Sequence, residues 1–153
     1  MDKKYLRVLY ILLGCTLLFI WGNSLLPASV SGSISAFIKE LLSRLLGFME
    51  DTEGDGLLRK LAHGLEFAAL GAELLLLGRE KKWPRSGILL GGLGVSLMDE
   101  TIQLFVEGRN GAIRDVWIDM GGFFFGIMVC LVVVKSFPWG KGDHHSGSHQ
   151  NPT

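Results

Sequence analysis

Residues 5–26 read YLRVLYILLGCTLLFIWGNSLL, an apolar run whose only charged residue is Arg7. A helix needs roughly 20 such residues to cross the hydrocarbon core of a bilayer, and a secretory signal has a shorter apolar region of about 7–15 residues. This run therefore predicts an uncleaved transmembrane helix. Three more stretches have a suitable length, residues 57–78, 87–106 and 115–137. The sequence predicts an all-α polytopic membrane protein with four transmembrane helices.

The overall composition supports the membrane class and excludes nucleic-acid binding. Of the 153 residues 48% are hydrophobic, and the mean hydropathy is +0.36. Lys and Arg together number 15, as do Asp and Glu, so no net positive field exists to attract nucleic acid. Cys15 and Cys130 both lie inside apolar runs, where neither indicates a disulfide or a zinc ligand.

Two segments outside the spans have their own patterns. Residues 33–46 place apolar side chains at helical spacing, which predicts a short amphipathic helix on the membrane surface or packed over the bundle. Residues 140–153 are rich in Gly, Ser and His and predict a disordered cytoplasmic tail. The expected organisation is one membrane domain over residues 1–139, with its motif core at 59–129, followed by the tail.

The distribution of Lys and Arg predicts the orientation. Nine of these residues fall on the side that carries both termini and the loop 79–85, and six on the other side. Because short loops rich in Lys and Arg stay in the cytoplasm, we expect a bacterial inner-membrane protein with both termini cytoplasmic. The polar residues within the last three spans then lie in the outer half of the membrane.

Ionisable side chains occur in three of the predicted spans, where they are costly to bury. Helical spacing gives each span one polar stripe, and steps of three or four keep its members on one face. The predicted fourth span also carries small residues on this face, so the face should pack against another helix. The three stripes are Lys60, His63 and Glu66; Asp99, Glu100 and Gln103; and Asp115 and Asp119 with Gly122 and Gly126.

We expect these stripes to line one pocket open to the outer surface, with His63 within about 8 Å of Asp99, Glu100 or Asp115, since neighbouring helices lie 8–10 Å apart. Arg109 should fold back to pair with one of those carboxylates. The pocket has more carboxylates than cations, so protons or a divalent cation must neutralise the excess. No metal ligands are predicted, because no tight spacing such as H-E-x-x-H is present. Alternatively, the chain is a structural or partner-binding membrane protein whose buried charges only fix helix packing.

The spacing of these residues resembles that of the VanZ-like family of bacterial membrane proteins. The resemblance rests on K-x-x-H-x-x-E-F from Lys60, D-E-x-x-Q from Asp99, G-R ending at Arg109, and D-x-x-x-D from Asp115. Phe67 stands where the family usually has Tyr, and Asp119 where it usually has Asn. The resemblance implies a protein of the bacterial cell envelope, whose founding relative is associated with low-level teicoplanin resistance, and it implies no established reaction.

The functional hypothesis is an outer-leaflet pocket for a lipid-linked envelope precursor or a glycopeptide-type ligand, with membrane lipids as further partners. The sequence leaves the cofactor unknown, and no catalytic motif decides whether the protein is an enzyme. If it is one, an imidazole beside a carboxylate suits a general base near neutral pH. The catalytic candidates are His63, Glu66, Asp99 and Glu100; the ligand-binding candidates are Lys60, Gln103, Arg109, Arg114, Asp115 and Asp119.

Overall fold

The computed structural model describes residues 3–33, 36–37, 40, 55–109 and 111–136. Four long helices account for most of these residues, and no strand occurs among them. The all-α prediction is confirmed. The predicted amphipathic segment falls largely outside the described residues, and the predicted tail falls entirely outside them. The helices are α1 (Lys3–Ser24), α3 (Asp55–Lys81), α4 (Arg85–Gln103) and α5 (Ile113–Ser136).

Within the described part of the chain, three helical segments are long and apolar enough to cross a membrane: Lys3–Ser24, Lys60–Lys81 and Ile113–Ser136. Helix α4 is less apolar than these three segments and is not among them, because Asp99, Glu100 and Gln103 lie in its last turns. The prediction of four spans is therefore supported for three helices. Large apolar side chains also cover the outside of the bundle, with Leu18 on α1 75% exposed and Trp117 on α5 74% exposed.

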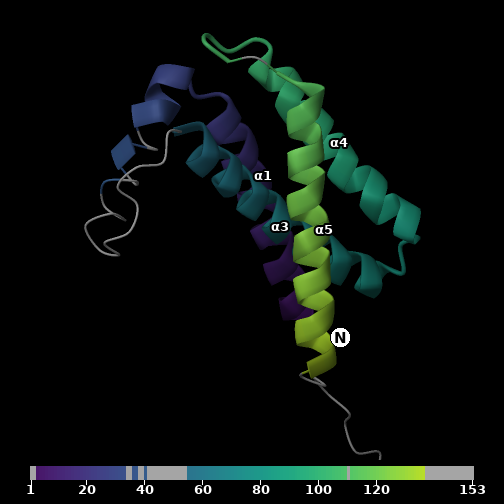
Figure 1. The fold of residues 1–153 in the computed structure, drawn as a ribbon. Helices are drawn as coiled ribbons and strands as arrows, with labels where there is room; N and C mark the ends of the chain where they lie inside the picture. Colours follow the sequence, from purple (N-terminus) through teal and green to yellow (C-terminus); the bar gives the residue numbers. More distant parts are fainter. Residues whose placement is uncertain (1–2, 34–35, 38–39, 41–54, 110, 137–153) are drawn as a thin grey trace, which may run out of the picture.

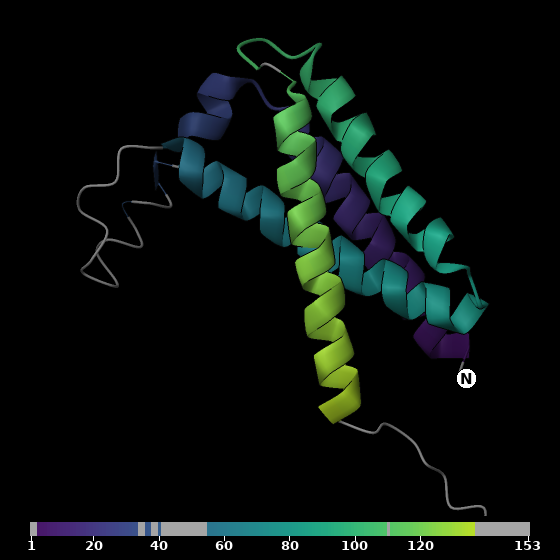
Figure 2. The same ribbon diagram turned by 45° about the vertical axis from the view of Figure 1, so that its right-hand side comes forward.

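The helices alternate in direction, so the C-terminal ends of α1 and α4 meet the N-terminal ends of α3 and α5 (Figures 1 and 2). At the opposite end α5 diverges from the other three helices, as Figure 2 shows. Phe67 of α3 and Phe123 of α5 are fully buried at the centre of the apolar core. Around them pack the other buried core residues Ile20, Leu70, Leu74, Ile88, Val116 and Met120.

The closest packing in the bundle is between α3 and α5, which run in the same direction. A Cβ placed on Gly122 would collide with the backbone of Gly64, and one on Gly126 would collide with the backbone of Ala68. A Cβ on Gly71 would collide with the backbone of Phe123 in the same way. The predicted packing role of the glycine face of α5 is confirmed, because only residues without a side chain permit this approach.

A short connection joins α3 to α4. At the end of α3, the Trp83 amide donates to the Gly78 carbonyl at 2.8 Å, and Lys82 has a φ of 55°. Pro84 has an extended conformation and directly precedes α4. Only three residues, 82–84, therefore separate the end of α3 from the start of α4. The turn predicted at residues 79–85 is confirmed, and it returns α4 alongside α3.

Candidate functional site

His63 lies between two carboxylates near the N-terminal end of α3. Its Nδ1 is 3.0 Å from Glu66 Oε2, one turn further along the same helix, and its Nε2 is 3.4 Å from Asp99 Oδ2 on α4. A doubly protonated imidazole can donate to both carboxylates, whereas a neutral one can donate to only one of them. The prediction that His63 lies within about 8 Å of Asp99, Glu100 or Asp115 is confirmed.

Asp99 is fully buried and connects three helices. The Ser24 hydroxyl at the end of α1 donates to Asp99 Oδ1 at 2.6 Å, and the Gln103 amide donates to Oδ2 at 2.9 Å. Asn23 extends the same contact region, since its Nδ2 donates to Glu66 Oε1 at 3.0 Å. Helix α1 is therefore part of the site.

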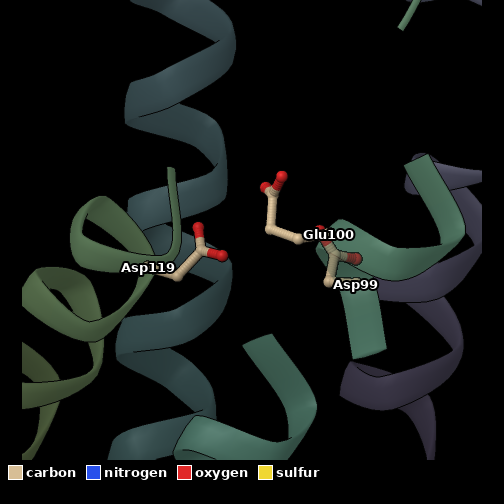
Figure 3. Close-up of side chains that lie close together, drawn as sticks. All are labelled: Asp99, Glu100 and Asp119. Atoms are coloured by element: carbon tan, nitrogen blue, oxygen red, sulfur yellow. The ribbon is translucent and has the colours of Figure 1, made fainter. Parts of the chain in front are cut away.

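Asp119 and Glu100 bring α5 into the cluster. Ser96 on α4 donates its hydroxyl hydrogen bond to Asp119 Oδ2 at 2.8 Å, and both residues are almost completely buried. The Ala112 amide, just before α5, donates to Glu100 Oε2 at 2.8 Å. Figure 3 shows Asp119 and Glu100 approaching each other from different helices, with Asp99 beside Glu100.

The carboxylates of Asp99, Glu100 and Asp119 form the tightest acidic group in the described part of the chain. One oxygen from each lies within 4.8 Å of the others. Oxygen donors of this kind suit Mg²⁺, Ca²⁺ or Mn²⁺. If these three and Glu66 are all ionised, a doubly protonated His63 leaves an excess of three negative charges. Protons or a cationic group must offset that excess, because like charges in a poorly solvated site cannot all stay ionised.

The cavity beside this cluster is small. Its volume is about 20 Å³, enough for one water or one ion, since a water needs roughly 10–15 Å³. A cavity thus lies where the stripes were expected to form a pocket, but a sugar or peptide group does not fit inside it. A large ligand would have to bind at the mouth of the cavity. The cavity is lined by Lys60, His63, Glu100, Gln103, Asp115, Ile118 and Asp119.

The two candidate arginines lie in different environments. Arg109 is buried, and its guanidinium donates to the Asn23 and Leu26 carbonyls, each at 2.9 Å. These carbonyls lie at the end of α1, where a helix leaves backbone acceptors without partners. Arg109 therefore connects the segment between α4 and α5 to α1 through these two hydrogen bonds. Its expected pairing with a carboxylate stays a prediction. Arg114 is exposed on the first turn of α5 and does not line the cavity.

Sequence reasoning did not find the contribution of Asn23, Ser24 and Ser96. Asn23 and Ser24 are polar residues at the end of an otherwise apolar run, which was the available signal. Glu73 on α3 is also bonded to α1, because the Thr16 hydroxyl donates to its Oε1 at 2.9 Å. Three hydrogen bonds thus connect α1 to carboxylates on α3 and α4.

Together, the fold and the site define a class: helical proteins with membrane-length apolar helices and a buried cluster of carboxylates and one imidazole at one end. The particular family follows from comparison of the sequence with known families. The profile of the VanZ/LLP1 family matches residues 8–134, which includes all of the site, and the chain belongs to this family. No curated protein and no solved structure matches the chain significantly.

Phe67 and Asp119, the two residues expected to depart from the usual family pattern, both lie at the site. Phe67 is fully buried, and its ring meets the His63 ring edge to face, with centroids 6.3 Å apart. Asp119 accepts the Ser96 hydrogen bond and contributes to the acidic group. The first departure places a hydrocarbon surface beside the imidazole, and the second increases the negative charge of the cluster.

Proposed function

We propose that this protein is a multi-pass protein of the bacterial inner membrane in which α4 is the fourth span, beside three more apolar helices. Both termini are cytoplasmic, and the polar cluster lies in the outer half of the bilayer. The unequal distribution of Lys and Arg supports this orientation. The position of α4 against α1, α3 and α5 supports its burial at membrane depth, where its carboxylates contact protein groups.

We infer that the cluster recognises the polar group of a lipid-linked envelope precursor or of a glycopeptide-type ligand. The observation that carries this proposal is the convergence of His63, Asp99, Glu100, Gln103 and Asp119 from three helices beside one cavity. The excess negative charge favours a ligand that presents ammonium or hydroxyl donors. The small cavity admits only an end group, so the rest of the ligand lies against the membrane-exposed surface.

The residues divide into two roles in this proposal. Lys60 and Asp115 lie at the cavity and contact the entering group, together with Glu100 and Gln103. His63 and Glu66 orient Asp99, and they take part in proton transfer if the ligand is also a substrate. A link to glycopeptide resistance follows from the family resemblance.

A second proposal has its own support. Asp99 bonds to α1, Glu66 bonds to α1, and Asp119 bonds to α4, so the buried carboxylates also act as connections between helices. Polar contacts of this kind stabilise membrane helix pairs by about 0.6–2 kcal/mol each. In this second proposal the cluster only holds the bundle together.

The isosteric variant Glu100→Gln separates the two proposals. Glutamine keeps the volume and can still accept from the Ala112 amide, but it removes the charge at the cavity. The ligand-binding proposal predicts that teicoplanin protection of cells is lost while the amount of protein in the membrane is unchanged. The affinity of the Glu100→Gln variant for the ligand should fall about tenfold or more, because a hydrogen bond to a charged group contributes about 1.5–3 kcal/mol.

Glu80→Gln is the matched control, since Glu80 is an exposed carboxylate at the opposite end of α3. It should leave both protection and protein level unchanged. If Glu100→Gln keeps full protection, or loses protection only in proportion to its membrane level, the packing proposal replaces the ligand-binding one.

A further inference from the structure

A large apolar groove lies at the end of the bundle opposite the polar cluster, where α5 diverges from α3 (Figure 2). Its volume is about 570 Å³, within the roughly 300–1,000 Å³ of sites that hold small ligands. Small side chains of α3, Ala68 and Ala72, form one wall, and Phe125, Val129 and Val133 of α5 form the other. Tyr5 of α1 closes one side.

The same end of the bundle is strongly basic. Among the described residues at the helix ends there, the only acidic one is Glu80, and Glu73, at the level of the groove, bonds to Thr16 of α1. Arg79 is exposed in the last turn of α3, two turns after Ala72 of the groove and on the same face of the helix. The basic residues of this end are Lys3, Lys4, Arg7, Arg79, Lys81, Lys82, Arg85 and Lys135.

An apolar groove with cations beside it suits a molecule that has both a hydrocarbon chain and a negative charge. We propose that the groove between α3 and α5 is a binding site for an anionic phospholipid, with an acyl chain between Ala72 and Val133 and its phosphate among the basic residues around Arg79. Guanidinium suits phosphate because it offers two parallel donors. Basic pockets between membrane helices bind anionic headgroups in this way. The site is separate from the polar cluster and does not depend on its proposed function.

A second copy of the chain is the competing occupant of an apolar groove. Two copies packed side by side in the same orientation would bring their basic ends together, which like-charge repulsion disfavours. An anionic lipid instead neutralises these charges. The charge pattern therefore favours the lipid.

Native mass spectrometry of the purified protein tests the proposal, after reconstitution with equal amounts of phosphatidylglycerol and phosphatidylcholine. The wild type should retain phosphatidylglycerol preferentially. Ala72→Trp should abolish that preference by filling the groove, whereas Ala69→Trp, on the exposed face of the same helix, should preserve it. Arg79→Gln should weaken retention about fivefold, and the control Arg85→Gln should weaken it less.

A second matched pair of variants distinguishes loss of lipid binding from misfolding. Val133 lines the groove, and the neighbouring Val132 is 60% exposed and does not. Val133→Trp should therefore reproduce the loss, and Val132→Trp should not. Equal retention of the two lipids by the wild type would overturn the proposal, as would equal behaviour within both tryptophan pairs. A dimer that dissociates in Ala72→Trp and Val133→Trp would assign the groove to a second copy instead.

Discussion

The close approach of α3 and α5 predicts opposite effects for two glycines on the same helix. A Cβ at Gly126 would overlap the Ala68 carbonyl and Cα, which are backbone atoms and cannot rotate away. Overpacking of this kind costs about 1–3 kcal/mol. Gly121 has open space where a Cβ would be, so alanine there only gains helix propensity, about 1 kcal/mol. Gly126→Ala should therefore be less stable than Gly121→Ala.

Since Gly126→Ala gains the same propensity, the difference between the two variants is the overpacking cost, about 1–3 kcal/mol. Reversible unfolding in mixed micelles with increasing SDS, followed by circular dichroism, measures it. Separation of the helices should also move Asp119, two turns earlier on α5, away from the acidic group. Equal unfolding midpoints for the two variants would refute the close approach of the helices.

Two other predictions concern α1 and the orientation of the chain. Ser24→Ala removes the hydroxyl that bonds Asp99, so it should lower the free energy of unfolding by about 0.6–2 kcal/mol in the same SDS titration, whereas Ser33→Ala, on an exposed serine, should have almost no effect. An unchanged midpoint for Ser24→Ala would contradict a stabilising bond between α1 and Asp99. A reporter fused after Trp139 should be active only in the cytoplasm, and activity on the outer side would invert the proposed orientation.

Helical periodicity was sufficient to predict the elements and much of the site. The first span was expected at residues 5–26 and α1 covers Lys3–Ser24, because the apolar run itself determines the helix. The polar face of each helix and the packing role of Gly126 followed from residues that share one helical face. These are properties of single helices, which a sequence displays directly.

Contacts between helices far apart in the sequence could not be predicted in the same way. Ser24 bonds to Asp99, 75 positions later, but a serine at a helix end can equally satisfy its hydroxyl on the local backbone. Arg109 bonds to the carbonyls of Asn23 and Leu26, and a backbone acceptor has no signature in the sequence. The size of the cavity depends on such packing, so the pocket expected from the sequence for a large ligand is larger than the cavity in the structure.

In the proposed topology, in which α4 is the fourth span, the bonds to Asp99 also bear on how the chain enters the membrane during synthesis. Ser24 and His63 precede Asp99 in the sequence, so both leave the ribosome before it does. When α4 reaches the translocon, the groups that bond Asp99 are already present on α1 and α3. A partnered carboxylate enters hydrocarbon at lower cost than an isolated one. The order of the helices along the chain thus provides α4 with its partners before insertion, and moving α1 to the end of the chain should make α4 the helix that fails to insert.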